Sequence, residues 1–96
     1  MKSQSGEDGW RQFLGLCKNL KTIKQLNEFF DLFLTAEERC AVGYRCALIK
    51  ALLKKEESQR DIAMRLGISI AKISRGSNYL KIISKDLRGF LENQLV

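Results

Sequence analysis

The sequence contains no histidine and only three cysteines, and this limits the metal chemistry that the chain can support. Cys17, Cys40 and Cys46 stand singly rather than in a C-x-x-C spacing, so a zinc or iron–sulfur site would lack its usual ligands. We interpret the three cysteines as small buried apolar residues of a protein in a reducing cytosol. We expect no metal site and no cofactor.

Enzymatic chemistry also lacks a starting point in this sequence. Without histidine there is no imidazole base, and the chain has neither a glycine-rich phosphate loop nor a carboxylate pair flanked by catalytic partners. We expect that the protein is not an enzyme.

Long apolar runs are missing as well. Residues 1–9 are polar and contain glycine, without the apolar segment of a signal peptide, and we expect them to form a flexible N-terminal arm. No later segment stays apolar over the ~18 residues that a membrane span needs. We therefore expect a cytoplasmic protein without a membrane partner.

The length and the charge of the chain point to its partners. Its 96 residues allow one domain, and a helical domain of this size buries little surface, so pairing with a second copy would stabilise it. With 17 Lys and Arg against 11 Asp and Glu, the formal net charge is +6. This favours a polyanionic partner, because basic side chains release the counterions that condense on nucleic acid.

Proline is absent, and single glycines and short polar clusters separate the apolar segments, which is typical of helices joined by tight connections. From Trp10 to Leu20 the apolar residues recur at three- and four-residue steps and predict an amphipathic helix. The segment Leu26–Leu34 is so rich in Phe and Leu that we expect a short helix buried on most sides. The fold class is therefore all-α.

A long helix is predicted to begin after Thr35. Glu38 follows Thr35 at the spacing of a capping box, and the acidic first turn suits the positive end of the helix dipole. Apolar residues cover so much of the segment that runs to about Lys54 that we expect it to form the spine of a dimer.

A helix-turn-helix motif is predicted at about residues 58–82. Ser58 caps the first helix, Gly67 can adopt the left-handed conformation that ends it, and Ser69 caps the second helix. Ile73 is expected to face back into the core, as the motif requires. A short helical hairpin in a bundle could show the same residues.

The exposed positions of this segment favour DNA over a plain helical hairpin. Basic side chains cluster around its two helices together with short polar donors and acceptors, and only Asp61 interrupts them. These residues are Gln59, Arg60, Arg65, Ser69, Lys72, Ser74, Arg75, Asn78 and Lys81.

Several motifs, in this order and spacing, resemble the tryptophan repressor family. They are LT at residues 34–35, EER at 37–39, GYR at 43–45, SQR at 58–60, ISRGSN at 73–78 and LK at 80–81. ISRGSN is the most specific of them. The resemblance extends from about Phe30 to the end of the chain and fades in the first predicted helix.

The resemblance implies a six-helix intertwined homodimer, with residues 10–96 as one dimerisation and DNA-binding domain. It implies a repressor that binds L-tryptophan as corepressor, which orients the helix-turn-helix for double-stranded operator DNA. The regulated genes would serve tryptophan biosynthesis or salvage. Two alternatives are a ligand-independent helix-turn-helix regulator and a helical interaction dimer that does not bind DNA.

Matched residue by residue, the resemblance also implies the two sites. The tryptophan site would use Arg45, Thr35, Arg75, Gly76 and Tyr79, with backbone carbonyls near Leu32 and Leu34 of the partner chain. The DNA contacts would be made by Gln59, Arg60, Ser69, Ile70, Ala71, Lys72 and Ser74. The chemistry is consistent, because a zwitterionic aromatic ligand needs a cation, carbonyl acceptors and flat surfaces for its ring.

Each of these residues also has an ordinary structural interpretation. Arg45 could extend its charge to solvent or pair with an acid, Arg75 could be a phosphate contact only, and Thr35 is already explained as a helix cap. Ile70 and Ala71 could serve core or dimer packing.

Three positions depart from the family pattern. Tyr79 stands where a small hydroxyl residue is expected near the ligand's amino end, and Tyr44 replaces a threonine beside Arg45. Both could reshape the ligand slot. Lys72 replaces a small residue on the reading helix and should strengthen general attraction to phosphate.

Overall fold

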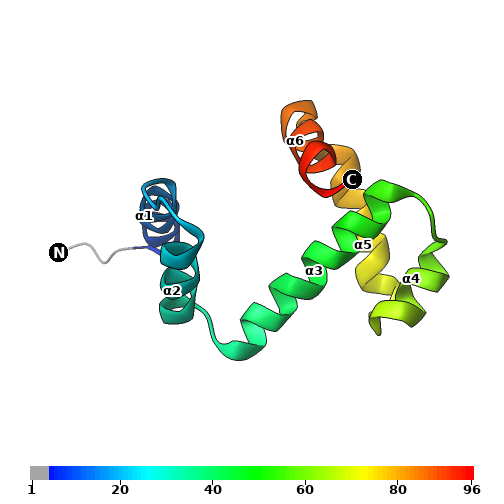
Figure 1. Cartoon of the computed structure of the whole chain (residues 1–96), viewed down its shortest axis with the longest axis horizontal. Coiled ribbons are helices and arrows are strands. Elements are labelled where there is room, and N and C mark those ends of the chain that lie inside the picture. Colours follow the sequence, from blue (N-terminus) through cyan, green and yellow to red (C-terminus); the bar gives the residue numbers. More distant parts are fainter. Residues whose placement is uncertain (1–4) are drawn as a thin grey trace. The chain divides into compact units, whose positions relative to one another are not determined.

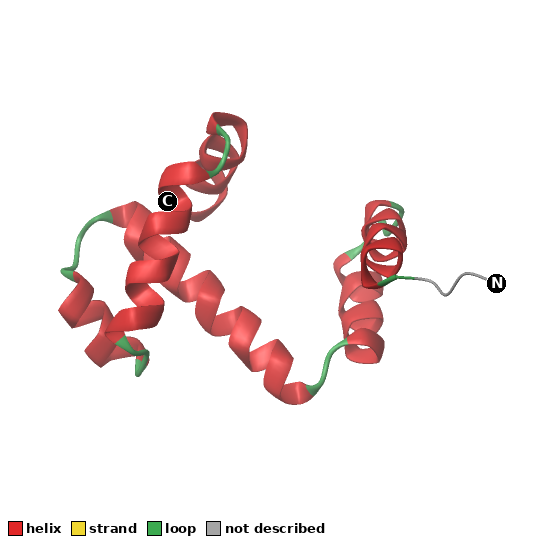
Figure 2. Ribbon diagram, turned by 180° about the vertical axis from the view of Figure 1, so that it is seen from behind, coloured by secondary structure: helices red, strands yellow, loops and turns green. Residues whose placement is uncertain are grey.

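The computed structural model describes residues 5–96, which form six α-helices and no strand (Figures 1 and 2). The helices are α1 Gly6–Lys18, α2 Ile23–Phe33, α3 Ala36–Lys54, α4 Gln59–Leu66, α5 Ile70–Ile82 and α6 Lys85–Leu95. The all-α class is confirmed. The chain divides into two compact units, residues 1–39 and 40–96, where the sequence suggested a single domain over residues 10–96. Dimerisation stays a prediction.

Helix α1 begins earlier than the apolar pattern suggested. Ser5 is its N-cap, because the Ser5 hydroxyl accepts from the Asp8 backbone N–H at 3.1 Å and the Ser5 N–H donates to the Asp8 carboxylate at 3.5 Å. This capping box satisfies backbone groups that would otherwise be unpaired. The predicted helix start at Trp10 was therefore four residues late, and of the expected flexible arm only residues 1–4 lie outside the described residues.

In the unit of residues 1–39, α1 and α2 meet through aromatic side chains. The Phe13 ring lies between 5.2 and 6.1 Å from the rings of Phe29, Phe30 and Phe33, measured between centroids. No residue of α1 or α2 is buried, and Leu32 is 80% exposed, so the expectation that the second helix is buried on most sides was wrong. Two helices share only one contact face, and the apolar side chains on their other faces stay uncovered within this unit.

The start of α3 has the predicted cap. The Thr35 hydroxyl accepts from the Glu38 N–H at 3.1 Å, and the Thr35 N–H donates to the Glu38 carboxylate at 2.8 Å. The Arg39 guanidinium then donates to Asp31 and Asn27 of α2. These bonds fix the connection between α2 and the first turn of α3.

The core of residues 40–96 lies where the end of α3 meets α4 and α5. Leu48 and Ala51 of α3 pack with Ile62 of α4 and Ile73 of α5, and the two isoleucines are fully buried. Figure 1 shows α5 crossing α3, with α4 beside the crossing. This contact holds the predicted helix-turn-helix on α3.

The cysteines do not belong to this core. Cys40 and Cys46 are exposed and Cys17 is half-buried, so the interpretation of all three as buried apolar residues was wrong. The core cluster uses α3 only from Leu48 onward and leaves the preceding turns uncovered.

Among residues 5–96, no group of three or more acidic or cysteine side chains is placed to hold a metal ion. None of their helices has the length and apolar character that crossing a membrane requires.

Helix α3 ends in a strained residue. Lys55 has φ 59°, the left-handed region that favours glycine, and its N–H donates to the Ala51 carbonyl at 3.3 Å. For a residue with a Cβ, this backbone conformation costs about 1–2 kcal/mol. The strain is local to the connection between α3 and α4.

We predict that Lys55→Gly raises the free energy of unfolding by about 0.5–1 kcal/mol, because the relief of strain exceeds the entropy that glycine gains in the unfolded chain. Urea denaturation at one fixed protein concentration measures the change. Lys54→Gly is the control, since Lys54 is helical and its replacement should lower the stability by a similar amount. Equal losses in both variants would contradict the prediction.

Candidate nucleic-acid interface and ligand site

Residues 58–82 form the predicted helix-turn-helix. The Ser58 hydroxyl accepts from the Asp61 N–H at 3.1 Å at the start of α4, and the Ser69 hydroxyl accepts from the Lys72 N–H at 3.2 Å at the start of α5. Between them Gly67 ends α4 with φ 65° and ψ 35°, the left-handed conformation. All three predicted roles are confirmed, and each follows from local backbone hydrogen bonding.

The two helices are locked together by apolar contact. Ile62 is 1% and Ile73 0% exposed, while Ala63 and Ile68 pack against the same cluster. The small Ala63 side chain lets the helices approach closely. Since Ile62 and Ile73 point into the core, the residues on the opposite faces of α4 and α5 point to solvent.

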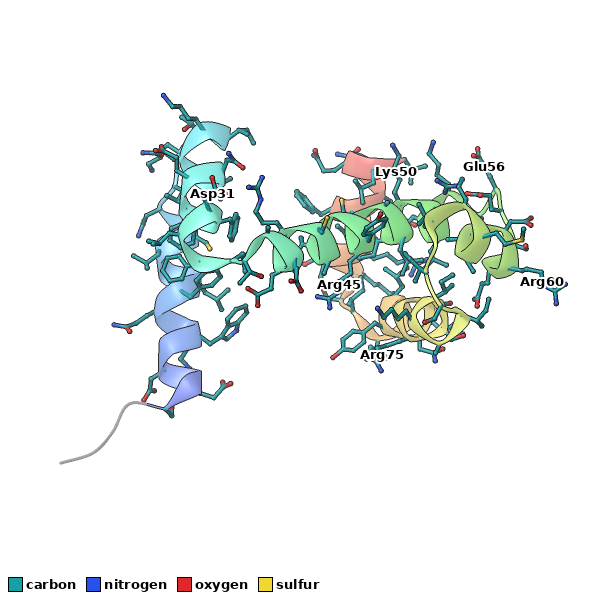
Figure 3. The ribbon with its side chains drawn as sticks, turned by 90° about the horizontal axis from the view of Figure 1, so that it is seen from below. Asp31, Arg45, Lys50, Glu56, Arg60 and Arg75 are labelled. Carbon is teal, nitrogen blue, oxygen red and sulfur yellow. The ribbon has the colours of Figure 1, made fainter. Side chains whose placement is uncertain are left out.

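Most of the predicted DNA contacts lie on this outer surface. Gln59, Arg60, Ser69, Ile70, Ala71 and Lys72 are exposed, and Ser74 is half-buried. Figure 3 shows Arg60 projecting outward from α4, and no acidic group in the described part of the chain pairs with Arg60 or Lys72. Ile70, which is 51% exposed, and Ala71 take no part in the core of this unit.

The positive charge of the chain is concentrated in the same unit. Residues 40–96 contain eleven Lys and Arg against five Asp and Glu, whereas residues 1–39 contain six of each. The unit with the helix-turn-helix therefore has the whole net charge of +6. This is the charge distribution that a protein needs to neutralise phosphates with one part of its surface.

Four predicted ligand residues, Arg45, Arg75, Gly76 and Tyr79, lie in residues 40–96. In Figure 3 Arg45 and Arg75 lie on the side of α3 where α5 runs, and Lys50 projects from the other side. Both arginines are exposed, neither pairs with an acid among residues 5–96, and Tyr79 is 63% exposed.

Gly76 of α5 faces the Leu48 and Leu52 side chains of α3. A Cβ built on Gly76 would lie 3.2 Å from Leu48 Cδ2 and 3.6 Å from Leu52 Cδ1. A side chain at this position would therefore press against Leu48 of α3.

The remaining predicted ligand residues, Leu32, Leu34 and Thr35, belong to the other unit. Leu32 is 80% exposed and Leu34 half-buried, and Thr35 caps α3. The structure describes the two units separately, so it does not bring these three residues together with Arg45 and Arg75. Their part in a ligand site stays a prediction.

An ion pair that the sequence did not indicate lies beside the motif. Arg65 Nε donates to Glu57 Oε2 at 2.8 Å and Arg65 Nη2 donates to Glu57 Oε1 at 2.7 Å. These hydrogen bonds lower the pKa of the Glu57 carboxyl and raise that of the Arg65 guanidinium. The sequence groups Arg65 with the DNA-facing cations, but in the structure its guanidinium pairs with Glu57. The eight-residue separation is not a helical spacing, so no pattern signalled the pair.

The comparisons with known proteins identify relatives over nearly the full chain. A family model described as Trp repressor protein matches residues 8–95. A Trp operon repressor homolog of Chlamydia caviae is 45% identical over 97% of this chain and 92% of its own length. Those of Chlamydia trachomatis serovar D and Haemophilus influenzae are 44% and 37% identical, over 99% and 90% of this chain and 100% and 85% of their own lengths. The similarity therefore includes the first helix, where the motifs had suggested that it fades.

We predict that Gly76→Ala lowers the free energy of unfolding by about 1 kcal/mol, because the added methyl group overpacks against the buried Leu48 side chain. Gly15→Ala is the matched control. Gly15 is an exposed helical glycine with nothing near its Cβ, so alanine there should stabilise by about 0.5–1 kcal/mol. Stabilisation by both substitutions in a urea titration would show that α3 and α5 are not closely packed at Gly76.

Proposed function

The chain belongs to the Trp repressor protein family, and we propose that it is a tryptophan-responsive transcriptional repressor that binds operator DNA as a homodimer. Members of this family are transcription regulators rather than enzymes. The observation that carries the proposal is the match over residues 8–95, which includes the complete helix-turn-helix at residues 58–82. We further propose that the regulated genes serve tryptophan biosynthesis or salvage.

On the DNA side, the N-terminal turn of α5 enters the major groove. Ile70, Ala71 and Lys72 form this turn and are exposed, while the N–H groups at the start of each capped helix favour phosphate. Arg60 is the best candidate for a guanine contact, because its planar guanidinium can grip two acceptors at once. Gln59, Ser69 and Ser74 add short donors to phosphates and base edges.

On the ligand side, tryptophan would occupy the side of α3 where α5 runs. Arg45 and Arg75 have no acidic partner among the described residues, so each can pair with the ligand carboxylate or stack on its indole ring. Gly76 leaves room for a close approach. A ligand that contacts both α3 and α5 biases the direction of α5, the helix that enters the major groove. Ligand binding is thereby coupled to DNA binding.

The partner chain would complete this site. The carbonyls near Leu32 and Leu34, with Thr35, would accept hydrogen bonds from the ligand ammonium group. The exposed apolar side chains of α1 and α2, including Trp10 at 53% exposure, supply a surface for a second copy. Tyr79 and Tyr44 lie on the two helices of the slot and would tune which indole compound fits it.

The first experiment titrates purified protein with L-tryptophan and related indoles and then measures DNA binding with and without each ligand at fixed salt. The DNA is a duplex enriched by the protein from a random-sequence pool. Tighter DNA binding with tryptophan supports the proposal. Equal binding without ligand would make the protein a ligand-independent regulator, and no DNA binding would leave a helical interaction dimer.

Arg75→Ala should abolish the response to tryptophan while the dimer stays folded, because the substitution removes a cation expected at the ligand carboxylate. Isothermal calorimetry measures the ligand affinity directly. Lys81→Ala removes one exposed cation from the same helix and should leave that affinity unchanged. Unchanged tryptophan affinity in Arg75→Ala would exclude Arg75 from the ligand site.

Arg60→Ala should weaken binding to the enriched duplex by about 1–3 kcal/mol and relax base choice at one position of each half-site. A competition series with single base changes in the duplex measures both effects. If the loss on random-sequence DNA is as large, Arg60 contacts phosphate rather than a base.

A further inference from the structure

The Glu57–Arg65 ion pair spans the whole length of α4. Glu57 lies in the connection from α3, directly before the N-cap Ser58, and Arg65 lies in the last turn of the helix. The two parallel hydrogen bonds, at 2.8 and 2.7 Å, form the bidentate geometry in which an arginine holds a carboxylate most firmly. The entry to the helix-turn-helix is thus tied to the end of its first helix.

The rest of the connection has little else to hold it. Lys55 is in the strained left-handed conformation, and Lys55 and Glu56 are exposed and form no ion pair in the described part of the chain. Glu57 is its half-buried residue, with 30% of the side chain exposed. The direction of α4 relative to the end of α3 therefore depends on the core contact and on this ion pair.

The ion pair also lies where α3 and α4 face each other. A hollow of about 410 Å³ is lined by residues of the end of α3, the connection and α4. Its lining consists of Ala47, Lys50, Ala51, Lys54, Glu56, Glu57 and Arg65. Both members of the ion pair line this space, where the ion pair connects α4 to the residue before its N-cap.

We propose that Glu57 and Arg65 are positioning residues for operator binding, which hold α4, and with it α5, in the direction that the operator requires. This inference rests on the proposed function. Suppose that α4 and α5 exchange between a direction that can bind operator and one that cannot. The apparent affinity for operator is then proportional to the fraction of molecules in the binding direction. Loss of the ion pair lowers that fraction, so it weakens the binding of operator and of tryptophan by the same factor.

The decisive comparison is between Glu57→Gln and Glu56→Gln. Both substitutions remove one negative charge at the same hollow, which by electrostatics alone strengthens DNA binding. Only Glu57→Gln breaks the ion pair. We expect Glu57→Gln to bind the enriched duplex about twofold to fivefold more weakly than Glu56→Gln without tryptophan, the range of an exposed ion pair.

The response to ligand separates positioning from a loss of fold. At saturating tryptophan the difference between the two variants should shrink, because the ligand already selects the competent direction. Calorimetry without DNA should show the same factor in tryptophan affinity. Circular dichroism and gel filtration check that both variants remain folded and associated.

A charge swap supplies the rescue. Glu57→Arg combined with Arg65→Glu keeps the net charge and can re-form the pair, so it should bind DNA more tightly than the equally charged double variant Glu57→Gln with Arg65→Gln, which cannot form an ion pair. Glu57→Gln binding as tightly as Glu56→Gln without tryptophan, or a swap without rescue, overturns this inference alone. Failure of the wild-type protein to bind DNA overturns the proposed function and the inference together.

Discussion

The structure of residues 40–96 depends on one apolar contact, the packing of Ile62 and Ile73 against Leu48 and Ala51. Each fully buried isoleucine contributes about 1.5–3 kcal/mol, which is a large share of the stability of a small domain. The contact draws three helices to one point. The contact thereby decides which residues of α4 and α5 face solvent. The polar and basic side chains on the outer surface are exposed because the apolar ones are held in the core.

The helix-turn-helix could be predicted from the sequence because its determinants are local. The serine caps accept hydrogen bonds from N–H groups within the same turn. Gly67 adopts a left-handed backbone conformation, which depends on the residue itself and not on its neighbours in space. The early start of α1 was equally local, and the Ser5–Asp8 spacing was the available signal. What could not be predicted was the exposure of α2, since a dense apolar segment does not say which surface covers it.

The same distinction between local and long-range determinants applies to the candidate sites. The exposure of Arg60 and Lys72 followed from the helical period once the inner face was known. The Glu57–Arg65 pair joins a connection to the far end of a helix, and such a contact exists only after the chain has folded. The proposed ligand residues belong to two units, and no local sequence pattern decides whether residues of different units come together.

The uneven charge of the chain has a consequence for assembly kinetics. Residues 1–39 are formally neutral, whereas residues 40–96 have the entire net charge. If two copies associate through residues 1–39, as proposed, the parts in contact carry no net charge, and the repulsion between the copies comes from their basic parts. In the proposed repressor, ionic strength would therefore change the rate of subunit encounter less than the rate at which the protein binds DNA.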